Sequence, residues 1–276
     1  MPSSFTDLET FWECPRKLGF RKLGYSPASQ NEAITTGSFV HEGLRAFFAG
    51  GAFDINYAHL AIDKAKDKAI LRVDKVADRE RHQKLISQAV EASNRAYMLL
   101  SRYFTAYTGD YKGAIPEVEI GHLEVVCHVD LIAEFEGELV IVDFKTSKSP
   151  DLRWYDFSGQ CDLYAYVLWN CPEDTNRIPF DKKANPVSLI IYDIIANEGL
   201  FRHTRPPNLE RGKRLFGQVS TLDNYEVSSL LGKPQYQWTC PRCQYFTPCY
   251  IAETGDMKQG IEYLIANYVK ESRKDK

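Results

Sequence analysis

Two apolar segments joined by a tight turn constrain the fold of this chain more than any other feature. Residues 123–135 and 138–146 are rich in β-branched and apolar side chains, and a Glu-Gly dipeptide at 136–137 separates them. Such a dipeptide between apolar runs predicts adjacent antiparallel strands. Asp130 lies six residues before the turn and Asp143 six residues after it. Pairing across the turn would therefore bring these two carboxylates close together.

The end of the second strand carries the chemistry that matters most. Side chains alternate along a strand, so Asp143 and Lys145 share one face while Val142 and Phe144 share the other. A carboxylate beside an ammonium can hold a divalent cation while the lysine orients, or helps to deprotonate, a water molecule. The alternative is an exposed ion pair at a strand end, which contributes little to stability.

Asp130 favours the metal site over the simple ion pair. It interrupts an otherwise apolar strand, and a buried carboxylate without a partner is costly. Asp130 therefore needs a cation, a hydrogen-bond donor or solvent at the strand end. Two carboxylates that converge on one point suit a hard, oxygen-seeking ion such as Mg²⁺ or Mn²⁺.

The rest of the chain predicts an α/β fold, a small mixed sheet in the middle flanked by helices. The 276 residues suit one large domain. Apolar spacing and capping residues predict helices over 4–12, 36–49, 55–107, 157–169, 208–231 and 256–270, a strand over 117–122, a buried strand over 187–195 and a partner strand over 200–205.

Three further residues sit in predicted helices near this hairpin. His41 stands among Val40 and Leu44, where a histidine is more often a satisfied core residue than a ligand. Gln160 and Tyr164 are four residues apart and so share one helix face, directly after the Asp143–Lys145 strand. Alone, that spacing is also typical of an ordinary amphipathic helix.

In this order, the residues resemble the RecB-like branch of the PD-(D/E)XK nucleases. That branch has a helical histidine, an aspartate in a strand, an Asp/Glu-x-Lys strand and a Gln-x-x-x-Tyr helix. The matching positions are His41, Asp130, Asp143-Phe144-Lys145 and Gln160 to Tyr164. The resemblance implies a restriction-endonuclease-like sheet and hydrolysis of phosphodiester bonds. It also implies that His41, Asp130, Asp143 and the Phe144 carbonyl hold Mg²⁺ or Mn²⁺, that Lys145 activates or positions the water, and that Gln160 and Tyr164 position the site or the DNA strand.

Four of the seven cysteines form a second pattern. Cys240, Cys243 and Cys249 follow a C-x2-C-x5-C spacing, and Cys14 stands alone near the N-terminus. Thiolates at such spacing suit tetrahedral zinc or an iron–sulfur cluster. One distant cysteine before a C-terminal trio is similar to the AddB-type and CRISPR-associated RecB-like exonucleases, which implies that these four hold a [4Fe–4S] cluster. Residues 1–35 and 232–276 would then form a cluster region of a single nuclease domain, beside a helical part over 36–110 and a catalytic sheet core over 111–205. The other three, Cys127, Cys161 and Cys171, are expected to be packing residues.

Charge and composition limit the expected cellular location and binding partners. The formal net charge of −3 gives no global sign of nucleic-acid binding, so DNA contacts must come from local patches. One candidate patch combines Lys148 and Arg153 with Trp154 and Tyr155, which suits phosphate pairing and base stacking on a single strand. A second basic cluster beside Cys14 contains Arg16, Lys17, Arg21 and Lys22. A solvated surface is the alternative for both. Without a signal-peptide or membrane-spanning pattern, a cytoplasmic location is expected.

These features together predict an exonuclease on DNA ends, single-stranded above all, in recombination, repair or CRISPR spacer processing. A structure-specific endonuclease is one alternative, and a non-catalytic DNA-binding or adaptor module with a structural metal cluster is another. No G-x-x-x-x-G-K-[ST] loop is present in the sequence. Any unwinding would therefore come from a partner helicase or from a CRISPR adaptation partner.

Overall fold

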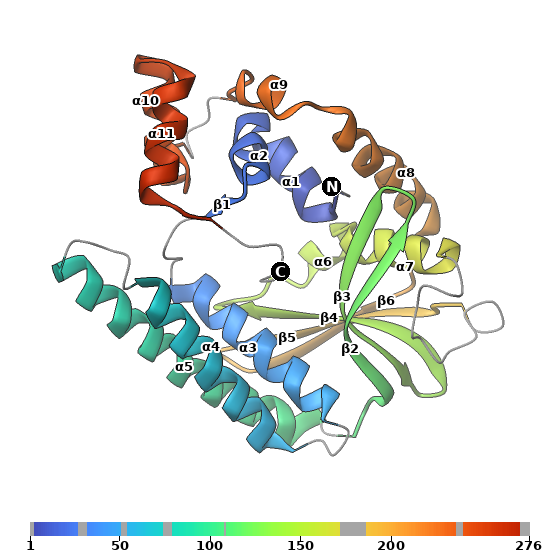
Figure 1. Cartoon of the computed structure of the whole chain (residues 1–276). Coiled ribbons are helices and arrows are strands. Elements are labelled where there is room, and N and C mark those ends of the chain that lie inside the picture. Colours follow the sequence, from blue (N-terminus) through green and yellow to red (C-terminus); the bar gives the residue numbers. More distant parts are fainter. Residues whose placement is uncertain are drawn as a thin grey trace.

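A mixed five-stranded sheet occupies the middle of the chain, as the sequence predicts. The computed structural model describes residues 3–26, 32–50, 54–73, 79–107, 109–171, 186–235 and 240–270. The strands are β2 (Lys112–His122), β3 (Val125–Phe135), β4 (Glu138–Ser147), β5 (Leu189–Ala196) and β6 (Leu200–Arg205), and they follow this order across the sheet (Figure 1). All pairs are antiparallel except β4 and β5.

The predicted turn fixes the register of the central hairpin. Phe135 pairs with Glu138, and the two residues between them both have positive φ, 54° at Glu136 and 87° at Gly137. A two-residue hairpin turn of this type needs positive φ at both central positions, which glycine adopts without strain. The pairing then runs back to Leu131 opposite Val142, so the sequence correctly placed Asp130 and Asp143 at the end of this ladder.

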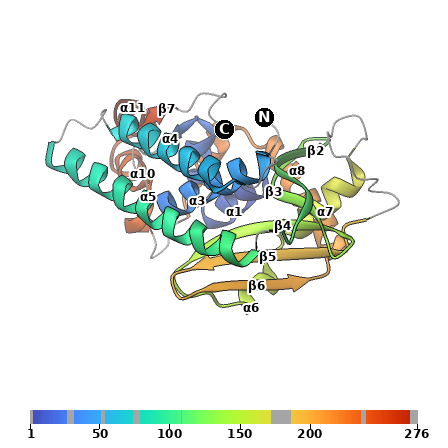
Figure 2. The ribbon, with the colours of Figure 1, turned by 90° about the horizontal axis from the view of Figure 1, so that it is seen from below.

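Helices cover both faces of the sheet. The described helices are α1 (Phe5–Glu13), α2 (Pro15–Lys22), α3 (Glu32–Ala49), α4 (Ile55–Val73), α5 (Arg79–Tyr107), α6 (Arg153–Phe157), α7 (Gln160–Asn170), α8 (Leu209–Ser220), α9 (Val227–Leu231), α10 (Phe246–Thr254) and α11 (Met257–Asn267). Along β4, Leu139 and Ile141 pack into the core beneath α7, while Val140 and Val142 pack into the core beside α3 and α5. Coverage of both faces explains the continuous apolar run. Figure 2 shows α3, α4 and α5 side by side.

Several predicted boundaries were wrong in detail. The helix around His41 begins at Glu32 rather than Thr36, and the stretch 55–107 holds two helices, α4 and α5. A helix over Phe246–Thr254 had not been expected at all. None of the helices within the described ranges is long and apolar enough to cross a bilayer.

The two ends of the described chain meet, which corrects the prediction that strands are confined to the middle. A second, two-stranded sheet pairs β1 (Tyr25–Ser26) with β7 (Val269–Lys270). The Tyr245 hydroxyl donates to the Tyr25 carbonyl at 2.7 Å. A small apolar core of Phe20, Leu231, Tyr245 and Leu264 lies beneath them. Apolar burial and backbone pairing therefore join the ends, together with side-chain contacts such as the ion pair between Arg16 and Glu253.

Candidate active site

Asp130 sits where β3 parts from β4. The backbone ladder between the two strands ends at Leu131 and Val142. Beyond it, Asp130 Oδ2 accepts a hydrogen bond from the Phe144 amide at 2.8 Å, so a side chain continues the link between the strands. This bond fixes the carboxylate beside the catalytic strand. It also places the Phe144 backbone next to Asp130, while the Phe144 ring lies in the core on the α3 side.

His41 and Asp130 come together, and Glu117 joins them. His41 Nδ1 lies 3.6 Å from Asp130 Oδ2. A nitrogen of His41 and one carboxylate oxygen each of Glu117 and Asp130 all lie within 4.8 Å of one another, and no other such group of three histidine, cysteine or acidic residues occurs in the part of the chain that the structure describes. Helix α3 can approach this end of the sheet because Gly37 has no Cβ, which would lie 3.0 Å from Thr146 Oγ1.

The chemistry of this group fits a divalent cation. Burial raises the pKa of Asp130, and the nearby charge of Asp143 raises it further. Partial burial of its carboxylate likewise raises the pKa of Glu117, although the residue as a whole is exposed, and Asp130 raises it further. Carboxylates that repel one another in this way are stabilised by a shared cation. One imidazole and two carboxylates form a donor set that suits Mn²⁺ or Mg²⁺.

Asp143 belongs to an adjoining chain of contacts that reaches α7. Asp143 is 2% exposed, and its Oδ2 lies 2.7 Å from Lys145 Nζ. Lys145 Nζ donates to Gln160 Oε1 at 3.3 Å, and Gln160 Nε2 donates to the Tyr164 hydroxyl at 2.5 Å. The structure therefore brings these four predicted residues together, but it leaves Asp143 outside the tight group of His41, Glu117 and Asp130.

Two observations bear on the roles of Asp143 and Lys145. Asp143 Oδ2 contacts Lys145 as an ion pair but has no hydrogen bond of proper geometry, so this buried oxygen retains acceptor capacity. Burial on its own would lower the pKa of Lys145, but the charges of Asp143 and Asp130 outweigh it and raise the pKa above its ordinary value. Lys145 is thus held as a cation, which favours positioning a water or a phosphate over removing a proton.

Glu117 is the main residue that sequence reasoning missed. Its φ of 50° is left-handed, a strained backbone for a residue with a side chain, and such strain clusters at functional sites. His122 pairs with Val125 around a two-residue turn, and the pairs on either side of Glu117 place it opposite Asp130. The counting that linked Asp130 to Asp143 would also have linked Glu117 to Asp130 if the strand after His122 had been started at Val125 instead of Leu123, which leaves residues 123 and 124 as the turn.

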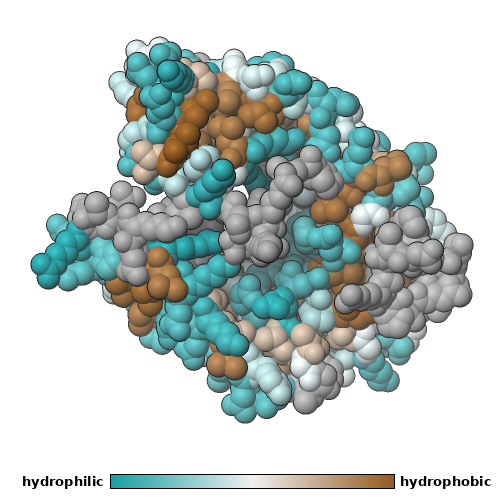
Figure 3. All heavy atoms as spheres, in the orientation of Figure 1, coloured by the Kyte–Doolittle hydropathy of each residue, from teal (hydrophilic) through white to brown (hydrophobic). Residues whose placement is uncertain are grey.

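A second missed residue comes from the N-terminal layer. Burial raises the pKa of Glu9 on α1, Lys145 opposes that effect, and Asp143 adds to it. Helix α1 therefore places another carboxylate, on an exposed residue, within electrostatic range of Asp143 and Lys145. Figure 3 shows the molecule hollowed between the α3–α5 layer and the α1–α2 layer, with many hydrophilic side chains around the hollow.

Comparison with known proteins identifies the family. A family model described as the PD-(D/E)XK nuclease superfamily matches residues 2–250. The chain belongs to the PD-(D/E)XK nuclease superfamily. PD-(D/E)XK nucleases act on DNA with divalent metals, and the mixed, helix-flanked sheet is consistent with their restriction-endonuclease-like fold.

Two further comparisons add little to this assignment. No curated protein is significantly similar to this nuclease. Among solved structures, the crystal structure of SSO0001 is similar to it over 63% of this chain and 79% of that chain, at 16% identity and a TM-score of 0.32. The family assignment does not depend on this similarity.

The predicted DNA-contacting residues of this PD-(D/E)XK nuclease lie on and before α6. Trp154 is 74% exposed, and Arg153 is exposed in a two-point ion pair with Asp151. Lys148 is also exposed. Tyr155 instead points inward, with its ring centroid 5.0 Å from that of Tyr192. Phe157, which the sequence did not single out, is 76% exposed and stands three residues after Trp154, on the same helix face.

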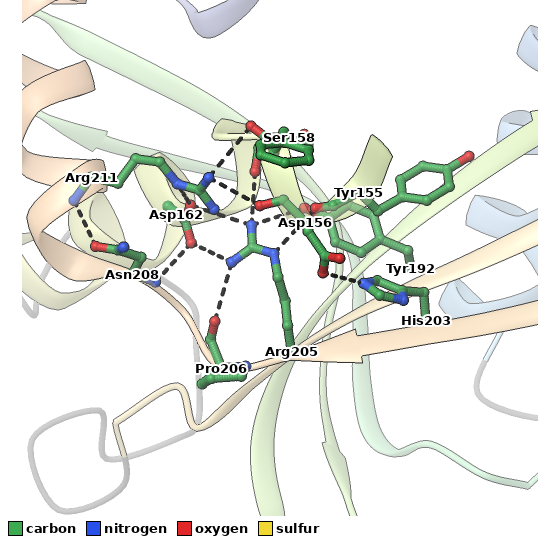
Figure 4. A network of polar contacts seen from close by, with 11 residues as sticks. Tyr155, Asp156, Ser158, Asp162, Tyr192, His203, Arg205, Pro206, Asn208 and Arg211 are labelled. Atoms are coloured by element: carbon green, nitrogen blue, oxygen red, sulfur yellow. Dashed lines mark hydrogen bonds and ion pairs between the residues drawn. The ribbon is translucent and has the colours of Figure 1, made fainter. Parts of the chain in front are cut away.

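A buried polar network holds α6 in place (Figure 4). Asp162 on α7 is fully buried and accepts from Arg205 at 2.7 Å and from Arg211 at 2.5 Å. The two guanidinium groups also donate to backbone carbonyls of the α6 region, namely those of Tyr155, Asp156, Phe157 and Ser158. Helix α6 therefore presents Trp154 and Phe157 from a fixed position next to the catalytic strand.

The four predicted cluster cysteines lie in the region where the chain ends meet. Cys14 Sγ accepts from the Gln235 amide at 3.5 Å, and Cys240 Sγ donates to the Gln235 carbonyl at 3.8 Å. Burial raises the pKa of Cys243 and of Cys249; Cys14 further opposes both thiolates, and Cys249 also opposes that of Cys243.

These sulfurs do not form a compact ligand set. Within the described ranges, no three of their Sγ atoms lie within 4.8 Å of one another. A single zinc ion with Zn–S bonds of about 2.3 Å would need its four sulfurs closer together than that. An iron–sulfur cluster spreads its thiolates further apart. The structure thus shows a shared neighbourhood for the cysteines but no preformed tetrahedron.

Proposed function

We propose that this protein is a metal-dependent exonuclease that hydrolyses phosphodiester bonds at the ends of single-stranded DNA. The observation that supports this proposal is that two groups of candidate site residues lie next to each other. His41, Glu117 and Asp130 converge on one point, and the contact chain from Asp143 through Lys145 and Gln160 to Tyr164 begins beside it. Membership of the PD-(D/E)XK superfamily makes a nuclease the expected use of this arrangement.

The first proposed role is to hold the divalent cation. His41, Glu117, Asp130, Asp143 and the Phe144 carbonyl are the proposed cation ligands. A bound divalent cation would lower the pKa of a water molecule and offset negative charge on the phosphate.

The contact chain supplies the positioning groups. Lys145 would hold the attacking water or a phosphate oxygen with its ammonium group, in an orientation that Gln160 maintains. Tyr164 would in turn fix Gln160, because their hydrogen bond leaves the amide little freedom to rotate.

The preference for a single strand rests on α6. Trp154 and Phe157 project from a helix that the Asp162 network holds rigid. Exposed aromatic rings stack on unpaired bases of any sequence, whereas a base-paired duplex hides those faces. Lys148 and Arg153 next to them would contact phosphates.

The first test uses linear and circular single-stranded DNA of equal length, with Mn²⁺. The linear strand is expected to be degraded and the circle to persist, because an exonuclease needs a free end. Rising salt should weaken binding, since phosphate contacts release counterions. The control is the Asp143→Ala protein prepared in parallel. Rapid cutting of circles would reject the exonuclease and favour the alternative, a structure-specific endonuclease.

For the cysteines, we propose a [4Fe–4S] cluster held by Cys14, Cys240, Cys243 and Cys249, as in the RecB-like iron–sulfur exonucleases. Their shared neighbourhood supports it, as does their separation from the catalytic strand. The cluster would act as a clasp on residues 1–35 and 232–276 within one nuclease domain. The same resemblance supports a pathway in recombination, repair or CRISPR spacer processing, with a partner helicase where duplex must be opened.

The colour and metal content of the protein test the proposed iron–sulfur cluster. Protein purified without oxygen is expected to be brown, with broad absorbance near ~400 nm from iron–thiolate bonds. Cys14→Ala should bleach it and lower its melting temperature, because it removes the ligand from the far end of the chain. Cys127→Ala, at a cysteine away from this region, is the control and should keep the colour. Colourless protein with stoichiometric zinc and no iron would reject the iron–sulfur assignment.

A further inference from the structure

A groove runs between α3, α4 and α5, outside the catalytic residues. Its volume is about 660 Å³. One wall is α4, from Tyr57 to Val73, and the others are the α3 residues from Thr35 to Ala46 and the α5 residues from Leu85 to Ala89.

Helix α4 turns its positive charge toward this groove. Lys64, Lys68 and Arg72 line it at intervals of four residues, which spaces them about 6 Å apart along the helix. The acidic residues of the same helix, Asp63 and Asp67, do not line it. The overall charge of the chain is negative, so this row is a local concentration of cations on one helix face.

The remaining lining suits an extended chain with flat apolar groups. Ala61, Ala65 and Ala69 leave room beside the cation row. At one end, Tyr57 is 50% exposed and Leu60 is 53% exposed. Cations in a row beside an accessible ring match the pattern of single-strand binding channels, where phosphates pair with the cations and bases stack.

The groove and the candidate metal site share helix α3. Glu42 and Arg45 line the groove from α3, and Glu42 directly follows His41 in the sequence. A strand that leaves the groove along α3 would therefore arrive at the candidate metal site.

We infer that this groove binds a single strand of nucleic acid, with successive phosphates on Lys64, Lys68 and Arg72, and leads it to the carboxylates. The inference rests on the proposed nuclease function, because the proposed nuclease site is where the bound strand would be cleaved. The spacing of the three cations, close to that of successive phosphates in an extended strand, favours a nucleic acid over a partner protein as the occupant.

The test compares two triple variants of equal charge. Lys64→Ala, Lys68→Ala and Arg72→Ala together remove the cation row. Lys66→Ala, Lys213→Ala and Lys258→Ala together remove three cations that do not line the groove. Binding of a labelled 30-nucleotide single strand is measured in EDTA, so that no cleavage occurs. The groove variant should bind about tenfold more weakly or worse, and its slope of log affinity against log salt should be smaller by about 2, the value for three lost phosphate contacts.

Equal binding by the two triple variants, with equal salt slopes, would overturn the inference. A charge-reversing single variant, Lys68→Glu, repeats the test if either triple variant melts well below the unaltered protein. Failure of the nuclease proposal would look different. Unaltered protein would then bind DNA through the groove in EDTA but fail to cut it when Mn²⁺ is supplied.

Discussion

Replacing Lys145 with alanine is expected to lower DNA cleavage by about 10²–10³-fold, the usual cost of losing one preorganised charge-stabilising donor. Lys145 is the only described link between Asp143 and Gln160, through contacts of 2.7 and 3.3 Å. Its loss removes the cation and also releases Gln160. The measurement is the single-turnover cleavage rate of end-labelled DNA with Mn²⁺ in excess. Asp130→Ala and Asp143→Ala should lose nearly all activity as well.

Two controls make this result specific to the site. Lys66→Ala removes a lysine that is paired with Asp63 on α4 and should cleave at the normal rate. Lys145→Arg restores a cation of different shape and should recover only part of the rate if position as well as charge matters. If folded Lys145→Ala protein cleaved DNA at a rate within threefold of normal, Lys145 would have no role in the reaction.

Asp162→Ala is expected to lower the free energy of unfolding by about 3–5 kcal/mol, the range for breaking a buried charge network from one side. Asp162 is completely buried, while the side chains of Arg205 and Arg211 are 10% and 23% exposed. Removing the carboxylate leaves two largely buried cations without their partner. Urea unfolding followed by circular dichroism measures the change.

Asp156→Ala is the matched control for the network. Asp156 contacts His203 at 2.8 Å but is 53% exposed, so this contact is screened by solvent and should contribute less than about 1 kcal/mol. Asp162→Asn keeps the shape and some of the hydrogen bonds and should fall between the two. If Asp162→Ala were no less stable than Asp156→Ala, the network would not be what holds α6 against α7.

The sequence allowed the centre of this fold to be predicted because short-range rules govern it. The Glu136-Gly137 turn determines the register of β3 and β4, and strand alternation places Asp143 and Lys145 on one face. The pairing of β6 with β5 followed from the same reasoning. In each case the partners are close in the sequence, so counting residues was enough.

Contacts between distant segments could not be predicted in this way. Glu9 reaches the candidate site because α1 packs across the sheet from the far end of the sequence. Asp162 lay inside the recognised Gln160–Tyr164 helix, but its two arginine partners are 43 and 49 residues further on. Tertiary packing decides both contacts.

The joining of the chain ends determines when this molecule can be completed during synthesis. Tyr25 cannot form its backbone pairing with Lys270 in the β1–β7 sheet until residue 270 has been synthesised. At about 5–20 residues per second, that delay is roughly 10–50 s. For most of that time, until residues 227–231 have emerged, the face of α2 that later contacts α9 has no partner. The central sheet has already left the ribosome by then, so the nuclease core can form first and the end region can close on it last.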